Sequence, residues 1–135
     1  MSEPWQPLLD GLTRLRTAWP RRGWSWDTRL SCVTSSINSD LEAQCRAIAL
    51  DALPAEWTAT SLATAPPKIR DLAERAGGLR AGQTVFSAGP LAGVLAYGLW
   101  WPWGDGVTIS LRVGLDIPVM QQPYPHFREL FGTSI

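Results

Sequence analysis

The stretch Val107-Thr-Ile-Ser-Leu-Arg-Val-Gly-Leu-Asp-Ile117 carries the clearest strand pattern in this chain. Apolar residues take every odd position, and polar residues or glycine take every even position. Because successive side chains of a strand point to opposite faces of its sheet, this pattern predicts a strand with one buried face. Such a strand needs a neighbour to satisfy its backbone hydrogen-bonding groups.

That neighbour is predicted to be Leu91–Trp101, a little earlier in the chain. This segment is apolar on both parities, as expected of a central strand that is buried on both faces. The loop Pro102–Gly106 between the two segments contains two glycines, which are free to adopt positive φ. We therefore expect an antiparallel hairpin.

The uncharged stretch Ala81–Gly104 is also long enough to cross a bilayer, which takes about 20 apolar residues. Two features argue against a membrane span. Gly89-Pro90 interrupts the stretch early, and the alternating strand that follows could not satisfy its backbone alone in lipid. We therefore expect no membrane partner.

Helical spacing of apolar residues, with proline and glycine at the ends, predicts four helices. They are expected at Pro7–Ala18, Ser39–Leu53 and Pro67–Ala76, and in the tail after Pro118. Ser39-Asp-Leu-Glu42 has the capping-box pattern of a helix start. In the tail, Phe127 and Phe131 are expected to dock the last helix on the body of the protein.

Alternation also predicts strands at Trp24–Thr34 and Gln83–Ser87, with a turn at Ala88–Pro90 and a connector at Ala55–Pro66. The complete prediction is a single α+β domain over residues 1–135, with element order α-β-α-α-β-β-β-α. Its antiparallel sheet has three to four strands, and its helices pack mainly on one face. Residues 118–135 form a proline-rich tail with a short docking helix. PAS-like and profilin-like sandwiches are compatible with this order, but such a likeness of topology assigns no function.

Composition narrows the class of protein. Apolar residues make up 45% of the chain and charged residues 18%, which is typical of a globular domain. The 12 basic and 12 acidic residues cancel, so no overall field attracts nucleic acid, and we expect no nucleic-acid partner. Lys68 is the only lysine, a skew toward arginine that is typical of a GC-rich, bacterial-like composition.

The two cysteines and the N-terminus indicate a location. Cys32 and Cys45 are too few for a disulfide scaffold and lack the close spacing of a metal or redox pair. The first residues have no basic region followed by an apolar run, which argues against a secretory signal. We expect a cytoplasmic protein with reduced thiols.

No catalytic motif stands out, so we expect no catalytic residue, metal site or cofactor. His126 is the only histidine and lies in the tail, and the nucleophile pattern Gly-x-Ser-x-Gly does not occur. Asp105 lies between two glycines, where turn chemistry explains it. An enzyme would need Tyr97, Arg112 and Asp116 to converge, so a non-enzymatic function is the prediction.

The first functional hypothesis is a non-enzymatic interaction module, such as an adaptor, an immunity-type inhibitor or a chaperone. Tryptophan is enriched at interface hot spots, and aromatic residues cluster at the hairpin end and in the tail. Its partner would be another protein or a second copy of the chain, and a homodimer is one form it could take. The residues expected to bind the partner are Trp100, Trp101, Trp103, Phe127 and Phe131.

The alternative hypothesis is a small-molecule sensor or carrier domain. Gly93 and Gly98 would leave room over the sheet for a ligand, in a pocket lined by Tyr97 and Arg112. Separately, Arg21-Arg22-Gly-Trp24 joins two cations to an aromatic ring and could contact an anionic partner. The simpler reading of this last motif is a loop in which arginine stacks on tryptophan.

Overall fold

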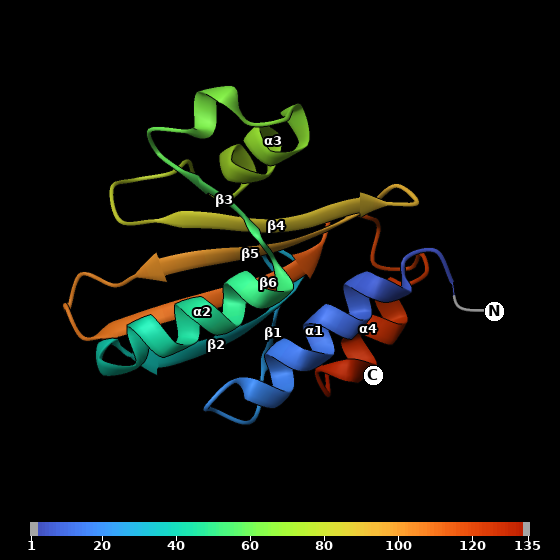
Figure 1. Cartoon of the computed structure of the whole chain (residues 1–135), viewed down its shortest axis with the longest axis horizontal. Helices are drawn as coiled ribbons and strands as arrows, with labels where there is room; N and C mark the ends of the chain where they lie inside the picture. Colours follow the sequence, from blue (N-terminus) through green and yellow to red (C-terminus); the bar gives the residue numbers. More distant parts are fainter. Residues whose placement is uncertain (1–2, 134–135) are drawn as a thin grey trace.

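The computed structural model describes residues 3–133, and over these residues the chain is an α+β fold with one antiparallel sheet of six strands and four α-helices (Figure 1). The helices are α1 (Gln6–Ala18), α2 (Glu42–Ala52), α3 (Pro67–Arg75) and α4 (Tyr124–Leu130). The strands are β1 (Ser25–Asp27), β2 (Cys32–Asn38), β3 (Ala55–Thr58), β4 (Thr84–Leu91), β5 (Val94–Pro102) and β6 (Thr108–Leu115). They lie in the order β1-β2-β6-β5-β4-β3.

The central hairpin is confirmed. β5 and β6 pair antiparallel, with Ala96 opposite Leu115 and Trp100 opposite Leu111. β4 flanks this pair on one side and β2 on the other. The stretch that could have spanned a bilayer therefore lies within a sheet. Among the described residues, every helix is too short or too polar to cross a membrane.

The predicted number of strands, three to four, is wrong partly because Trp24–Thr34 is not one strand. It breaks after Asp27, whose carboxylate accepts hydrogen bonds from the backbone N–H groups of Arg29 (2.9 Å) and Leu30 (3.2 Å). This side chain imitates a backbone turn, so the chain reverses and β1 pairs antiparallel with β2. Strand β2 then continues to Asn38, beyond the predicted end.

The other missed strand is β3, in the segment predicted to be a connector. Ala55–Thr58 pairs with β4 at the edge of the sheet, and the Trp57 indole donates to Ser87 Oγ across the pair at 3.3 Å. The predicted turn at Ala88–Pro90 is also wrong. β4 continues through an irregularity to Leu91, and its hairpin turn lies at Ala92-Gly93, both with positive φ.

The predicted capping box at the start of the second helix does not form. Asn38 caps this turn instead, because its side chain accepts the N–H of Asp40 at 2.9 Å. The first turn, Ser39–Leu41, is a 3-10 helix, and α2 begins at Glu42. The pattern located the helix correctly but assigned its cap to the wrong residue.

Three of the four helices cover one face of the sheet, and α3 covers the other (Figure 1). The larger core lies under α1, α2 and α4 and includes Phe86, Trp100 and Phe127. The smaller core lies under α3 and includes Val85, Tyr97 and Leu99. Because adjacent residues of a strand alternate between the faces, Trp100 belongs to the larger core and Leu99 to the smaller one.

Candidate functional site

Three of the five aromatic residues that were expected to bind a partner lie in the larger core. Trp100 is 1% exposed, Phe127 is 0% exposed and Phe131 is 4% exposed. Trp100 packs edge-on against Phe86, with the Arg46 guanidinium of α2 5.6 Å from its ring centre. The expectation that all five rings offer a surface is therefore corrected, because these three rings are enclosed in the core between the sheet and the helices α1, α2 and α4.

The other two lie at the far end of the β5–β6 hairpin. Trp101 points to the opposite face from Trp100 and is half-buried beside the smaller core. Trp103 is 53% exposed, and Val107 across the loop is 51% exposed. Asp105 holds this loop in shape, since its carboxylate accepts the hydroxyl of Thr108 and two backbone N–H groups. The Thr108 hydroxyl bond, with the backbone bonds after it, lowers the pKa of Asp105.

The motif at residues 21–24 is divided between surface and core. Arg21 and Arg22 are exposed, whereas Trp24 is 7% exposed and packs between Trp19 and Phe131, with ring centres 5.4 and 5.0 Å away. Within the part of the chain that the structure describes, neither arginine stacks on Trp24. Both arginines and Trp24 nevertheless line one hollow, next to the end of α4.

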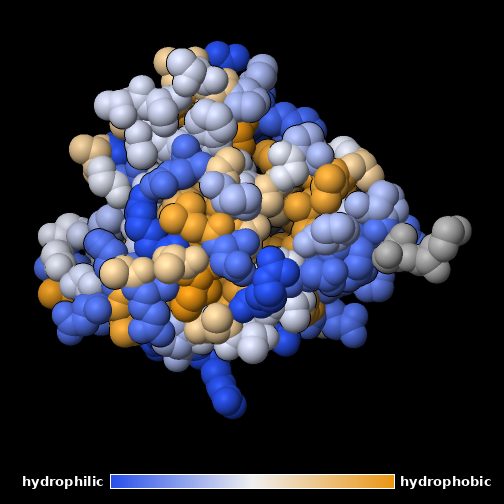
Figure 2. Space-filling view, in the orientation of Figure 1, coloured by the Kyte–Doolittle hydropathy of each residue, from blue (hydrophilic) through white to orange (hydrophobic). Residues whose placement is uncertain are grey.

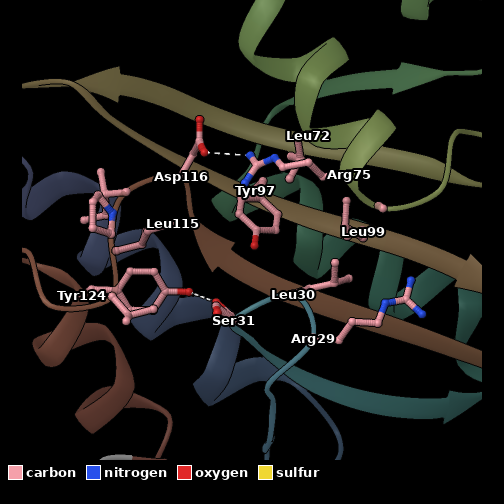
Figure 3. Close-up of a pocket in the computed structure, with 14 residues that line it drawn as sticks. Arg29, Leu30, Ser31, Leu72, Arg75, Tyr97, Leu99, Leu115, Asp116 and Tyr124 are labelled. Carbon is pink, nitrogen blue, oxygen red and sulfur yellow. Dashed lines mark hydrogen bonds and ion pairs between the residues drawn. The ribbon is translucent and has the colours of Figure 1, made fainter.

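Tyr97 lines a cavity on the α3 side of the sheet, with a volume of about 820 Å³ (Figure 3). The β1–β2 turn, the end of α3 and the segment after β6 form its walls. Most of the wall is apolar, from the side chains of Leu30, Leu72, Leu99, Leu115, Ile117 and Val119. A cavity of this size and lining is typical of sites that take small organic molecules.

The absence of a side chain at Gly114 leaves the space that the Tyr97 ring occupies. The two residues lie opposite each other on β5 and β6. A Cβ atom at position 114 would lie 2.4 Å from the Tyr97 hydroxyl oxygen and 2.6 Å from Cζ, closer than packed atoms allow. The even-numbered face of β6 therefore contains a glycine because the aromatic ring lies across it.

The Tyr97 hydroxyl lies inside the cavity wall without a partner of its own. Burial raises the pKa of Tyr97 far above its usual value, and the nearby Cys32 thiol adds to the effect, so the phenol stays neutral. No hydrogen bond joins its hydroxyl to another described residue. By contrast, the second tyrosine of the cavity, Tyr124, donates its hydroxyl to the carbonyl of Ser31 (Figure 3). One phenol is engaged, and the other is free to bond a ligand.

Charged residues lie at the rim of this cavity. Arg75 of α3 and Asp116 after β6 form an ion pair of 2.9 Å across one edge (Figure 3). Arg29 in the β1–β2 turn is exposed and forms no ion pair with a described residue. The guanidinium of Arg29 is therefore free to meet an anionic group that enters the cavity.

Arg112 lies in a smaller hollow beside the main cavity, with a volume of about 210 Å³. Four residues line both spaces: Arg29, Leu30, Ala76 and Leu99. We call the two spaces together the trough. Arg112 and the half-buried Trp101 line its far part. Tyr97 and Arg112, which were predicted to line one pocket, therefore lie in neighbouring parts of the trough and not side by side.

The Arg112 guanidinium is already occupied. Its Nε donates to Asp27 Oδ2 at 3.1 Å, and Nη1 donates to Ser110 Oγ at 3.1 Å. Burial alone would raise the pKa of Asp27, but the hydrogen bond from Arg112, with those from Leu30 and Arg29, holds it below its usual value. Arg112 therefore fixes the wall of the trough more than it offers a free charge.

The two glycines expected to leave room for a ligand do not do so. Gly98 faces the larger core, where a Cβ would lie 2.9 Å from Leu53 Cδ1, so this glycine admits Leu53. Gly93 lies in the β4–β5 turn with φ of 77°. Gly114 is the glycine that leaves room for a side chain of the trough. In the sequence it takes one of the even positions of β6, which otherwise hold polar residues, and this departure could have identified it.

The described residues show little chemistry for catalysis. They contain no cluster of three or more histidine, cysteine, aspartate or glutamate side chains placed to hold a metal ion. Burial raises the pKa of Cys32 to about 12 and that of Cys45 to about 11, so both thiols stay protonated and weakly nucleophilic.

Comparison of this chain with protein-family models, with curated proteins and with solved structures found no match.

Proposed function

We propose that this chain is a small-molecule-binding domain, a sensor or carrier, and that its ligand lies in the trough under α3. The main support is the free Tyr97 hydroxyl in the wall of a largely apolar cavity of about 820 Å³. Pockets that bind small organic molecules combine apolar walls with a few polar groups in this way. The burial of Trp100, Phe127 and Phe131 removes most of the aromatic surface on which the interaction hypothesis rested.

The lining indicates the chemistry of the ligand. Apolar side chains would contact a hydrocarbon or aromatic body, and the Tyr97 hydroxyl would bond one polar atom of it. The unpaired Arg29 guanidinium would bind an acidic group at the open side. The proposed ligand is therefore a small, mainly apolar molecule with one acidic group, such as an aliphatic or aromatic carboxylic acid.

The first test is native mass spectrometry of the purified protein, followed by thermal unfolding with a panel of aliphatic and aromatic carboxylic acids. We expect a bound mass or a panel member that raises the melting temperature. A ligand at about 100 times its Kd would add about 2.7 kcal/mol to the free energy of unfolding. A bare chain that no panel member stabilises would contradict the proposal.

A cavity-filling variant locates the site. Ala76 lines both parts of the trough and is 9% exposed, so Ala76→Phe would place a ring in the space where the ligand lies. The matched control is Ala47→Phe on the exposed side of α2. The first variant is expected to lose ligand binding and the second to keep it; equal binding by both would place the ligand elsewhere.

A second candidate function is protein binding through the hairpin end, supported by the exposure of Trp103 and Val107 on a firmly bonded loop. Figure 2 shows several separate apolar areas on the side in view, with hydrophilic side chains between them. The partner would be another protein or a second copy of the chain. Light scattering of the protein and of Trp103→Ala tests the second copy: a monomer in both cases argues against self-association.

The proposal includes a cytoplasmic location and no nucleic-acid, membrane or cofactor partner. Cys32 and Cys45 are both buried free thiols, as is usual in reducing compartments. The balance of 12 basic and 12 acidic residues gives no overall attraction to polyanions.

A further inference from the structure

A second hollow, about 650 Å³ in volume, lies between the end of α1, residues 19–24 and the end of α4. It shares no lining residue with the trough. Three arginines and one glutamate are the charged residues that line it: Arg16, Arg21, Arg22 and Glu129. Although the whole chain has no net charge, this hollow, which we call the arginine groove, is lined by three positive side chains and one negative side chain.

Two of the three guanidinium groups are already held in position. Arg16 Nη1 donates to the carbonyl of Leu130 at 2.7 Å, and Arg21 Nη1 donates to the carbonyl of Ser36 at 3.2 Å. Each bond uses one donor of a guanidinium that has several, so others remain available. Arg22 is exposed and forms no ion pair with a described residue.

A buried indole in the groove wall lacks an acceptor. Trp19 and Trp24 both line the groove, and both are more than nine-tenths buried. The Trp19 indole N–H donates to Ser35 Oγ at 3.0 Å. The Trp24 indole N–H is buried and has no hydrogen-bond partner among the described residues. Buried donors in folded proteins almost always have partners, and this one is closed to solvent, so a ligand oxygen would reach it only after a small shift of the groove wall.

We propose that the arginine groove binds the phosphate group of a small molecule. Arginine forks match the oxygens of a phosphate group, and an oxygen that reaches the Trp24 indole would satisfy its N–H. The rings of Trp19, Trp24 and Phe131 in the walls would contact an apolar part of the same molecule. This site is independent of the ligand proposed for the trough.

The test is a titration with phenyl phosphate, followed in the proton–nitrogen correlation spectrum of the tryptophan indoles. The chain has eight tryptophans, and Trp24→Phe identifies the Trp24 signal by its loss. Ionic strength is kept constant with sodium chloride. We expect the Trp24 signal to shift and saturate, while that of Trp103 on the exposed hairpin loop stays in place.

A double variant, Arg21→Gln with Arg22→Gln, is expected to weaken binding by about tenfold or more, since it removes two charged donors. The control is Arg70→Gln with Arg80→Gln, two exposed arginines outside the groove, which should leave the affinity unchanged. Both doubles alter only exposed side chains, so folding is expected to be retained, and their melting temperatures verify this. No saturable shift up to about 10 mM, or equal affinity in both doubles, would overturn the proposal.

Discussion

On one face of the sheet α1, α2 and α4 bury a continuous core, whereas on the other face α3, with nine residues, buries only a smaller cluster. The neighbours Trp100 and Trp101 show the result, because the first is 1% exposed and the second is half-buried. The sequence makes both faces of β5 apolar, but the helices that pack on each face decide which of its side chains are fully buried. The trough lies where that cover is thin.

Glycine plays a different part on each face. Gly98 makes room for Leu53, and both are buried in the well-filled larger core. Gly114 makes room for Tyr97, whose hydroxyl ends beside a cavity without a partner among the described residues. A glycine therefore completes the packing on one face and leaves room for a cavity-lining ring on the other.

The largest contrast is expected from removing the two neighbouring tryptophan rings. Trp100→Ala should lower the free energy of unfolding by about 3–5 kcal/mol, because it empties space in a packed core. Trp101→Ala should lower it by about 1 kcal/mol, because its ring is only half-buried. Urea denaturation of both variants measures the difference; equal losses would mean that the two faces are packed alike.

Gly114→Ala should break the arrangement around Tyr97. The new methyl group would overlap the phenol ring, so we expect the ring to move and the free energy of unfolding to fall by about 1–3 kcal/mol. The control is Gly104→Ala, where a Cβ meets nothing within 4 Å. Thermal and urea unfolding of both variants check this, and a Gly114→Ala protein as stable as the control would show that Tyr97 is not held against β6.

The ion pair between Asp27 and Arg112 should give a pH-dependent effect on stability. The pKa of Asp27 is lower in the folded chain than in the unfolded one, so its contribution is complete near neutral pH and is lost as pH falls below about 4. Asp27→Asn should cost about 1–2 kcal/mol at about pH 7 and much less at about pH 3. The same cost at both pH values would contradict this account of Asp27 and Arg112.

The smallest effect is expected at the hairpin end. Trp103→Ala should change the free energy of unfolding by less than about 0.5 kcal/mol, because half of the ring is already in solvent. Urea denaturation beside the Trp101→Ala variant measures it. A loss as large as that of Trp101→Ala would mean that the Trp103 ring packs against the body of the protein.

The central part of the fold follows from local pattern. The alternation in Val107–Ile117 and the apolar run in Leu91–Trp101 predicted β6 and β5, and both formed, although β5 begins only at Val94 because Leu91 ends β4. Strand β3 was missed because Ala55–Thr58 has only four residues, too few to show alternation, and its pairing with β4 carries no local signal. The break after Asp27 was missed because Asp27 fits the polar positions of the alternating pattern. Only the folded structure shows that its carboxylate accepts two backbone N–H groups and forms a turn.

The candidate site was less predictable than the fold. The sequence places Trp100 and Trp101 on opposite faces, but only the tertiary arrangement of α2 and α3 decides which ring is covered. Tyr97 was identified, whereas its reason for lying there, Gly114, was overlooked in favour of Gly93 and Gly98. Arg16 was missed at the arginine groove because it belongs to a helix and joins residues 21–24 only through the folded chain.

The difference between the two faces can be measured with dissolved oxygen, a small apolar paramagnet that enters open apolar space. Fluorine labels on the two tyrosines and eight tryptophans report its access, with Tyr97→Phe and Trp100→Phe assigning the signals. Tyr97 is 4% exposed and Trp100 is 1% exposed, so bulk solvent barely reaches either ring. If the trough is open as described, oxygen will relax the Tyr97 fluorine much faster than the Trp100 fluorine; equal relaxation of the two would contradict it.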